Sequence, residues 1–351
     1  MSNNKKTVLA SAFLISSLIL SGCGLFGAET VKKIDPPKST AYPKDSGLAS
    51  SIKDSTASEA VETIKTELYL IDKNGYVVSQ TLNLPKTTAV ATQAVKYLVE
   101  NGPISEMLPN GFRAVLPADT DVSVNITEDG VASVDLSKEF KNYQPEDEQR
   151  ILDSLTWTLT QFDSVKKVKL KMNGHELTEM PVNGTPISDT LSRESGINTD
   201  SSGVSDIMNT RPVTVYYIGG EESSYYYVPV TRRVSNSVKN TIEAAVMELA
   251  KGPSSASLDS DFMTNVQLVE KPKVEKGKVT LNFNDAVYGS FEKEKIISQH
   301  LLNALVLSLT ELEDIKEVSV QVNGKAELVR EDGKKLSEPV TRPEKVNTGS
   351  F

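Results

Sequence analysis

In the first half of the chain, apolar and polar residues alternate in short segments. Segments 65–72 and 76–84 are rich in strand-favouring residues, and Asp72-Lys-Asn-Gly75 between them is a turn signal. This pattern predicts a β-hairpin. Segments 122–126 and 132–136 also alternate, and they predict a second hairpin.

Apolar residues spaced three and four positions apart predict an amphipathic helix over segment 90–99. We expect Thr87 or Thr88 to cap its start. Gly102 is expected to supply a left-handed C-cap, and Pro103 prevents the helix from continuing. The helix therefore ends in a Gly-Pro pair.

A second amphipathic helix is predicted after Pro145, and Glu146 and Arg150 on it form a candidate i,i+4 ion pair. Segment 165–172 then reads as a strand that ends at the Asn173-Gly174 turn. The apolar stripe of this helix consists of Ile151, Leu152, Leu155, Leu159 and Phe162.

This order of segments recurs later in the chain. Leu152, Leu155, Leu159 and Thr160 return 150 positions later as Leu302, Leu305, Leu309 and Thr310. Segment 131–137 matches 278–284 with an offset of 147, so the two copies differ by a short insertion or deletion. Two copies of a β-β-α-β-β-α-β unit predict an α+β fold: two tandem two-layer domains, each a mostly antiparallel mixed sheet with two helices on one face.

The regions between the copies predict the domain borders. We expect a lipoprotein signal peptide over 1–22, a lipid-anchored disordered tether over 23–60 and the two domains over 61–186 and 211–339. The segment 187–210 is dense in Ser, Asp, Asn, Gly and Thr and is predicted to be a linker. The segment 340–351 is predicted to be a short polar tail.

The N-terminus carries an export signal. Lys5 and Lys6 precede an apolar run from Val8 to Leu20, which is shorter than the roughly 20 residues of a membrane-spanning helix. The run ends in Leu20-Ser21-Gly22-Cys23, which resembles a bacterial lipobox, so we expect Cys23 to be acylated. The alternative is an ordinary buried cysteine at the end of an uncleaved anchor.

Charge and composition narrow the function. The chain has 38 Lys and Arg against 47 Asp and Glu, a formal net charge of −9 that excludes nucleic acid as an expected partner. Cleavage before Cys23 removes two lysines and leaves −11, so attachment to anionic lipid should depend on the acyl chains. With one cysteine and two histidines, a disulfide framework and a Cys/His zinc site are hard to build.

The candidate catalytic residues are few, and we predict no enzyme activity, metal or cofactor. His175 and His300 have no second ligand at metal spacing and are expected on the surface. Asp135 and Glu139 could in principle act as an acid pair, but the second copy has Asn282 in place of Asp135. Asp135 is expected to bind backbone amides at the end of its strand.

Aromatic residues give the candidate interface. A run of tyrosines flanks the Gly219-Gly220 turn, and it predicts either cross-strand tyrosine pairs or an exposed patch that contacts a protein or glycan. The lone tryptophan lies off the leucine stripe of its helix, so a partly exposed interface role stays open. The candidate interface residues are Tyr216, Tyr217, Tyr225, Tyr226, Tyr227 and Trp157.

A lipobox and a polar tether precede the two copies. Each copy contains a helix ending in Gly-Pro, a strand at 131–136 or 279–283, a leucine-rich helix and a strand ending in Asn-Gly. This arrangement resembles the spore germination lipoproteins with tandem GerMN domains. The resemblance implies a role in sporulation and germination. It implies a lipoprotein on the outer face of the mother-cell membrane, facing the forespore, associated with the envelope-spanning channel.

We therefore expect a non-enzymatic scaffold or assembly factor. Its expected partners are the membrane, through the lipid anchor, and envelope or channel proteins of the sporangium. Binding or modification of peptidoglycan (cortex) is the alternative function, and homo-oligomerisation stays open.

Overall fold

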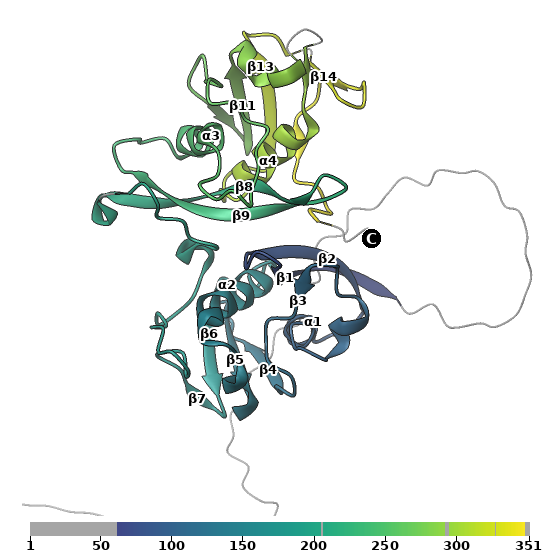
Figure 1. Cartoon of the computed structure of the whole chain (residues 1–351), viewed down its shortest axis with the longest axis vertical. Coiled ribbons are helices and arrows are strands. Elements are labelled where there is room, and N and C mark those ends of the chain that lie inside the picture. The colour runs from purple at the N-terminus through teal and green to yellow at the C-terminus, as the bar shows by residue number, and fades with distance from the viewer. Residues whose placement is uncertain (1–61, 205, 292–294, 327, 348–351) are drawn as a thin grey trace, which may run out of the picture. The chain divides into compact units, whose positions relative to one another are not determined.

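Each copy, hereafter repeat 1 and repeat 2, begins with a long antiparallel hairpin in the computed structural model (Figure 1). The hairpin of repeat 1 joins β1 (Thr63–Asp72) to β2 (Val77–Pro85), and β3 (Phe112–Arg113) pairs with the other edge of β1. The Asp72 carboxylate closes the turn, because Oδ1 accepts from the backbone N–H groups of Asn74 (2.9 Å) and Tyr76 (2.8 Å). In repeat 2 the hairpin consists of β8 (Thr210–Glu221) and β9 (Ser224–Ser235).

The structure describes residues 62–347 except 205, 292–294 and 327. The predicted signal peptide, lipobox and tether lie outside these residues, and so does Cys23. Within the part of the chain that is described, no helix has the length and apolar character needed to cross a membrane. All of the described residues belong to one compact unit.

A mixed sheet follows the hairpin in each repeat. Its strand order in repeat 1 is β4-β5-β6-β7, and β5 runs parallel to β6. In repeat 2 the order is β10-β11-β13-β16, with β11 parallel to β13. The strands are β4 (Val122–Ile126), β5 (Val131–Leu136), β6 (Lys167–Met172), β7 (His175–Glu176), β10 (Lys273–Glu275), β11 (Lys278–Phe283), β13 (Glu317–Val322) and β16 (Val340–Thr341).

The α+β class, the duplication and the mixed sheets are confirmed. The structure adds that hairpin and mixed sheet are separate sheets in each repeat, joined through a helix. That helix is α2 (Glu148–Leu159) in repeat 1 and α4 (Gln299–Leu309) in repeat 2. The Tyr69 backbone N–H on β1 donates to Thr158 Oγ1 (3.1 Å), and the Tyr216 N–H on β8 donates to Ser308 Oγ (2.9 Å). These equivalent contacts attach each hairpin to its helix.

The remaining elements are short. The first helices of the repeats are α1 (Val90–Lys96) and α3 (Thr241–Lys251). A further three-stranded sheet in repeat 2 consists of β12 (Ile296–Ile297), β14 (Leu328–Arg330) and β15 (Lys335–Leu336). The 3-10 segments are Pro103–Glu106, Lys138–Asn142, Pro145–Asp147, Arg193–Ser195, Ile207–Asn209 and Asp285–Phe291.

Three local predictions about the helices are wrong. The N-cap of α1 is Ala89, and the Thr87 hydroxyl accepts from the Ala89 N–H instead of capping the helix. The left-handed residue after α1 is Asn101 (φ 56°), whereas Gly102 has φ −86°. Arg150 binds the Asp147 carboxylate (2.6 Å) and reaches only the backbone oxygen of Glu146 (3.3 Å), because Asp147 points toward it from one helical turn away.

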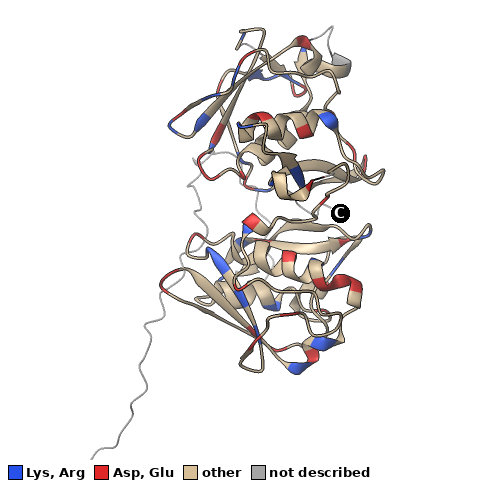
Figure 2. Ribbon diagram, turned by 90° about the vertical axis from the view of Figure 1, so that its left-hand side faces the viewer, with Lys and Arg blue, Asp and Glu red and all other residues tan. Residues whose placement is uncertain are grey.

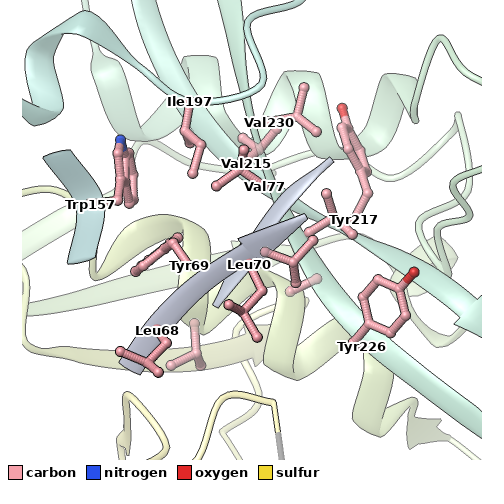
Figure 3. Close-up of a cluster of buried hydrophobic side chains, with 14 of the residues drawn as sticks. Leu68, Tyr69, Leu70, Val77, Trp157, Ile197, Val215, Tyr217, Tyr226 and Val230 are labelled. Atoms are coloured by element: carbon pink, nitrogen blue, oxygen red, sulfur yellow. The ribbon is translucent and has the colours of Figure 1, made fainter. Parts of the chain in front are cut away.

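The segments predicted to be a linker and a tail are parts of the fold. Leu191 bridges to Val168 on β6, and Val340–Thr341 forms β16 against β13. Ile197 and Asn347 are 0 % and 5 % exposed. The hydrophobic core is continuous through both repeats, and Figure 3 shows side chains from β1, β8 and β9 in one cluster with Ile197.

Candidate functional site

The aromatic candidates lie inside the protein. Trp157 is 1 % exposed, and the tyrosines Tyr216, Tyr217, Tyr226 and Tyr227 are 0 %, 1 %, 9 % and 4 % exposed. Only Tyr225, at 44 %, fits the predicted exposed patch. The alternative of cross-strand tyrosine pairs is also wrong, since Tyr225 and Tyr226 lie opposite Gly220 and Gly219. Tyr216 and Tyr227 pack against Leu307 of α4, and the Tyr217 hydroxyl donates to the Glu248 carbonyl on α3, so helices of their own repeat cover them. Tyr226 instead contacts repeat 1.

Tyr226 links the two repeats. Its ring lies against Gly219 and Gly220, where a Cβ atom would approach ring carbons to 2.9 Å. Its hydroxyl donates to Asp72 Oδ2 (2.7 Å) in repeat 1, and its ring lies edge-on to Phe112 at 5.0 Å. Burial and the Asp72 carboxylate both raise the pKa of Tyr226, so the hydroxyl stays a donor at physiological pH.

Trp157 holds the end of repeat 1. Its Nε1 donates to the Gly196 carbonyl (3.0 Å), and its ring lies 5.6 Å from that of Tyr69. The Arg193 guanidinium lies 4.3 Å from the centre of the Trp157 ring. The tryptophan therefore fixes the segment that was predicted to be a linker.

Two asparagine side chains connect β2 to β9, which are not paired in a common sheet. Asn198 Oδ1 accepts from the Val77 N–H, and its Nδ2 donates to the carbonyls of Val77 and Pro229, all at 2.8 Å. Asn347 Oδ1 accepts from the Tyr227 N–H (2.8 Å), and its Nδ2 donates to the carbonyls of Ser79 (2.8 Å) and Tyr227 (2.9 Å). We call this junction the seam.

The seam has internal two-fold pseudosymmetry. Tyr227 is the equivalent of Val77 and Pro229 that of Ser79, each offset by 150, and Asn347 is the equivalent of Asn198, offset by 149. Asn198 binds both backbone groups of Val77 and one carbonyl of repeat 2. In the same way, Asn347 binds both backbone groups of Tyr227 and one carbonyl of repeat 1. The two repeats thus meet as the subunits of a two-fold dimer would, but within one chain.

A sequence signal for the seam exists. Leu191-Ser-Arg193 and Ile197-Asn-Thr in the predicted linker recur as Val340-Thr-Arg342 and Val346-Asn-Thr in the predicted tail, at an offset of 149. Comparison of these two polar segments with each other would have found it.

The same pair of segments brings two arginines to one carboxylate. Arg193 Nη1 lies 2.8 Å from Glu311 Oε2, and Arg342 Nη2 lies 2.9 Å from Oε1. The Tyr216 hydroxyl donates to Oε1 (2.6 Å). Burial alone would raise the pKa of Glu311, but the charges of Arg342 and Arg193 outweigh it and hold that pKa below its usual value. This cluster joins α4 to the C-terminal segments of both repeats.

Two further carboxylates on α2 are buried. Glu148 accepts from the Tyr143 hydroxyl (2.9 Å) and the N–H groups of Asn183 (2.6 Å) and Thr185 (2.9 Å). Burial opposes its ionisation, but these hydrogen bonds outweigh it and lower the pKa of Glu148 to about 2. Burial raises the pKa of Asp153 to about 6, although Gln149 (2.7 Å) and the Asn198 N–H (2.9 Å) donate to it. Neither carboxylate faces a partner suited to acid–base catalysis.

The other polar candidates have structural contacts. Asp135 Oδ1 accepts from the Gly174 N–H (3.0 Å), and Asn282 Oδ1 accepts from the Gly324 N–H (2.9 Å) in repeat 2. The role predicted for Asp135 is confirmed, and it needs an acceptor oxygen but no charge. His175 is exposed on β7 as predicted. His300 is half-buried on α4 against the ring of Tyr225, at 4.3 Å between ring centres. No group of three or more His, Cys, Asp or Glu side chains among the described residues could hold a metal ion.

A pocket of about 770 Å³ opens beside the seam. Residues of both repeats line it: Lys73, Gln80, Asn110, Gly111 and Phe112 from repeat 1, Gly220, Glu221, Ser223, Ser224, Tyr225, Tyr226, Tyr227 and Asn303 from repeat 2, and Lys345, Val346 and Asn347 from the C-terminal segment. It brings Tyr225, the one exposed aromatic candidate, together with residues that the sequence analysis did not single out.

The comparisons with known proteins agree with the fold. Residues 67–178 and 214–328 match the Germane family, described as sporulation and spore germination. The chain is 57 % identical to the spore germination protein GerM of Bacillus subtilis (strain 168), over 98 % of both chains. The solved tandem GerMN domains of the sporulation protein GerM from Bacillus subtilis are 60 % identical with a TM-score of 0.78, over 82 % of this chain and 100 % of that one.

Proposed function

This chain belongs to the Germane family of sporulation and spore germination proteins. We propose that it acts in sporulation and germination as a membrane-anchored, non-enzymatic scaffold. Its place would be the outer face of the mother-cell membrane, toward the forespore. Its partners would be the envelope or channel proteins assembled in that space.

The seam is the observation that carries this proposal. A scaffold must hold its binding surfaces at a fixed separation, and here Asn198 and Asn347 join the two repeats through buried hydrogen bonds. The glutamate cluster at Glu311 adds a second connection. Because both halves of the junction belong to one chain, the pair forms at any protein concentration.

Charge supports a lipid anchor as the means of attachment. Lys and Arg are dispersed among Asp and Glu over both repeats (Figure 2). A chain with a net charge of −9 gains little from anionic headgroups. Acylation of Cys23 would supply the hydrophobic attachment instead.

Two experiments test the proposal in sporulating cells. Replacement Cys23→Ala should release the protein from the membrane fraction and reduce the yield of spores, whereas Ser21→Ala, which keeps a small residue in the lipobox, should not. Normal spore yield with a released Cys23→Ala protein would refute membrane anchoring as a requirement.

The scaffold role is tested by cross-linking and mass spectrometry of the wild-type chain in sporulating cells. We expect cross-links from both repeats to envelope proteins. Recovery of cross-links within this chain only would refute the role.

A further inference from the structure

We propose that the pocket beside the seam binds a glycan built of N-acetylated amino sugars. The proposal does not depend on the scaffold function, since it concerns a ligand rather than assembly. It rests on one side-chain amide without a hydrogen-bond partner, on the aromatic residues of the lining and on the backbone hydrogen bonds already made at the neighbouring strand edges.

The amide belongs to Gln80. Its side chain is 1 % exposed on β2, lines the pocket and makes no hydrogen bond among the described residues. A ligand that both donates to and accepts from this amide would give it the partners that it lacks among the described residues. An acetamido group presents one N–H donor and one C=O acceptor, which is the complement of what the Gln80 amide offers.

The equivalent position in repeat 2 is Val230, which is 3 % exposed and belongs to the hydrophobic core. The fold therefore accepts an apolar residue at this position of the strand. The polar residue in repeat 1 is not required by the architecture, and the site occurs once in the two repeats.

Aromatic rings supply the second part of the site. Tyr225 is 44 % exposed, and its ring is held edge-on against His300 (4.3 Å) and Tyr227 (5.9 Å). Phe112 and Tyr226 form another edge-on pair in the lining. Sugar rings have apolar C–H faces and polar rims, so they suit a pocket of aromatic rings and side-chain amides.

The strand edges nearest the pocket argue against an extended peptide. Peptides that add to a sheet need free backbone groups along an edge. Here the Asn347 side chain donates to the Ser79 carbonyl and binds both backbone groups of Tyr227. The Asn347 backbone carbonyl accepts from the Thr81 N–H. Four backbone groups along this stretch are therefore already bonded within the chain.

The charges of the lining allow one acidic group on the ligand. Lys73 and Glu221 pair with each other at 2.8 Å. Lys345 is exposed and has no ion pair among the described residues. A neutral acetamido glycan, or one with a carboxylate, is compatible with this balance.

The test is calorimetric titration of the full chain, purified in detergent, with a tetramer of N-acetylglucosamine. A tetramer of glucose is the control ligand, and a soluble peptidoglycan stem pentapeptide represents the peptide alternative. The variants are Gln80→Val, which introduces the residue found in repeat 2, and Tyr225→Ala. Gln267→Val, at an exposed position outside the pocket, is the control variant.

We expect the acetylated tetramer to bind and the glucose tetramer not to bind. Each pocket variant should raise the Kd about 10-fold or more, and Gln267→Val should leave it unchanged. If Gln80→Val does not fold, the exposed Tyr225→Ala decides the result. Absent binding, equal binding of both tetramers, or Gln80-dependent binding of the pentapeptide alone would overturn the proposal.

Discussion

Replacement of the seam asparagine Asn347 by aspartate exchanges one NH₂ group for an oxygen and leaves the size unchanged. The Tyr227 N–H keeps its acceptor, but the carbonyls of Ser79 and Tyr227 lose their shared donor and face a carboxylate. Asn347 is 5 % exposed, so water cannot replace the donor freely. At about 1–3 kcal/mol for each of these two buried carbonyls, the free energy of unfolding at pH 7 should fall by about 2–6 kcal/mol.

The cost should depend on pH. A protonated carboxyl can donate to one of the two carbonyls, so the seam favours the neutral form and raises the pKa of the introduced acid above its unfolded value of about 3.9. The variant should therefore be closest to the wild type below about pH 4 and lose stability as the pH rises through its folded pKa.

Urea unfolding followed by the fluorescence of Trp157, the single tryptophan, measures both effects. Asn198→Asp perturbs the equivalent position and should give a loss of similar size. Asn209→Asp, at an exposed residue, should change stability by less than about 0.5 kcal/mol. A loss at Asn347 no larger than at Asn209, or one independent of pH, would refute the assignment of the seam as a buried polar junction.

Three further variants test the buried carboxylates by the same unfolding assay. Glu311→Gln leaves Arg193 and Arg342 without their anion and should cost about 3 kcal/mol, whereas exposed Glu313→Gln should cost almost nothing; equal effects would contradict the ion cluster. Burial raises the pKa of Asp153 to about 6, so the wild type loses stability as the pH rises through 6. Asp153→Asn should therefore raise the free energy of unfolding at pH 7 by about 1–3 kcal/mol. If the variant and the wild type depend on pH in the same way, burial of an ionised Asp153 is not the cause. Glu148 has the opposite sign: with a pKa of about 2, its contribution is complete above about pH 4.5 and disappears as the pH falls toward 2, and Glu148→Gln should remove this acid-dependent step.

Periodicity predicted the regular elements well. The two hairpins of repeat 1 and the leucine-rich helices carry strong patterns of period two and period three to four, and the offsets of 147 and 150 identified the duplication. The structural role of Asp135 was predictable because a polar residue at the end of a strand has few local partners other than nearby backbone amides. The caps of α1 were mispredicted, since Thr87, Asn101 and Gly102 all have residue types that fit more than one turn position.

The junction between the repeats escaped prediction for a physical reason. Tyr216, Tyr217 and Tyr227 are covered by helices of their own repeat, whereas Tyr226 contacts repeat 1. The sequence of the hairpin does not indicate which element covers each of its faces. The segments around Asn198 and Asn347 are polar and irregular, so composition suggested a linker and a tail. The side chains of Asn198 and Asn347 are buried because they bind backbone groups at the edges of β2 and β9. This role can be recognised only when the positions of both strands are known.

The pairing of β2 with β9 through the asparagines has a consequence for how copies of this protein can associate. A two-fold contact is closed: it consumes the same edge on both participants and leaves none for a third. Further growth must therefore use surfaces away from the seam. Any such assembly would display twice as many GerMN units as it has chains, with the units added in pairs of opposite orientation.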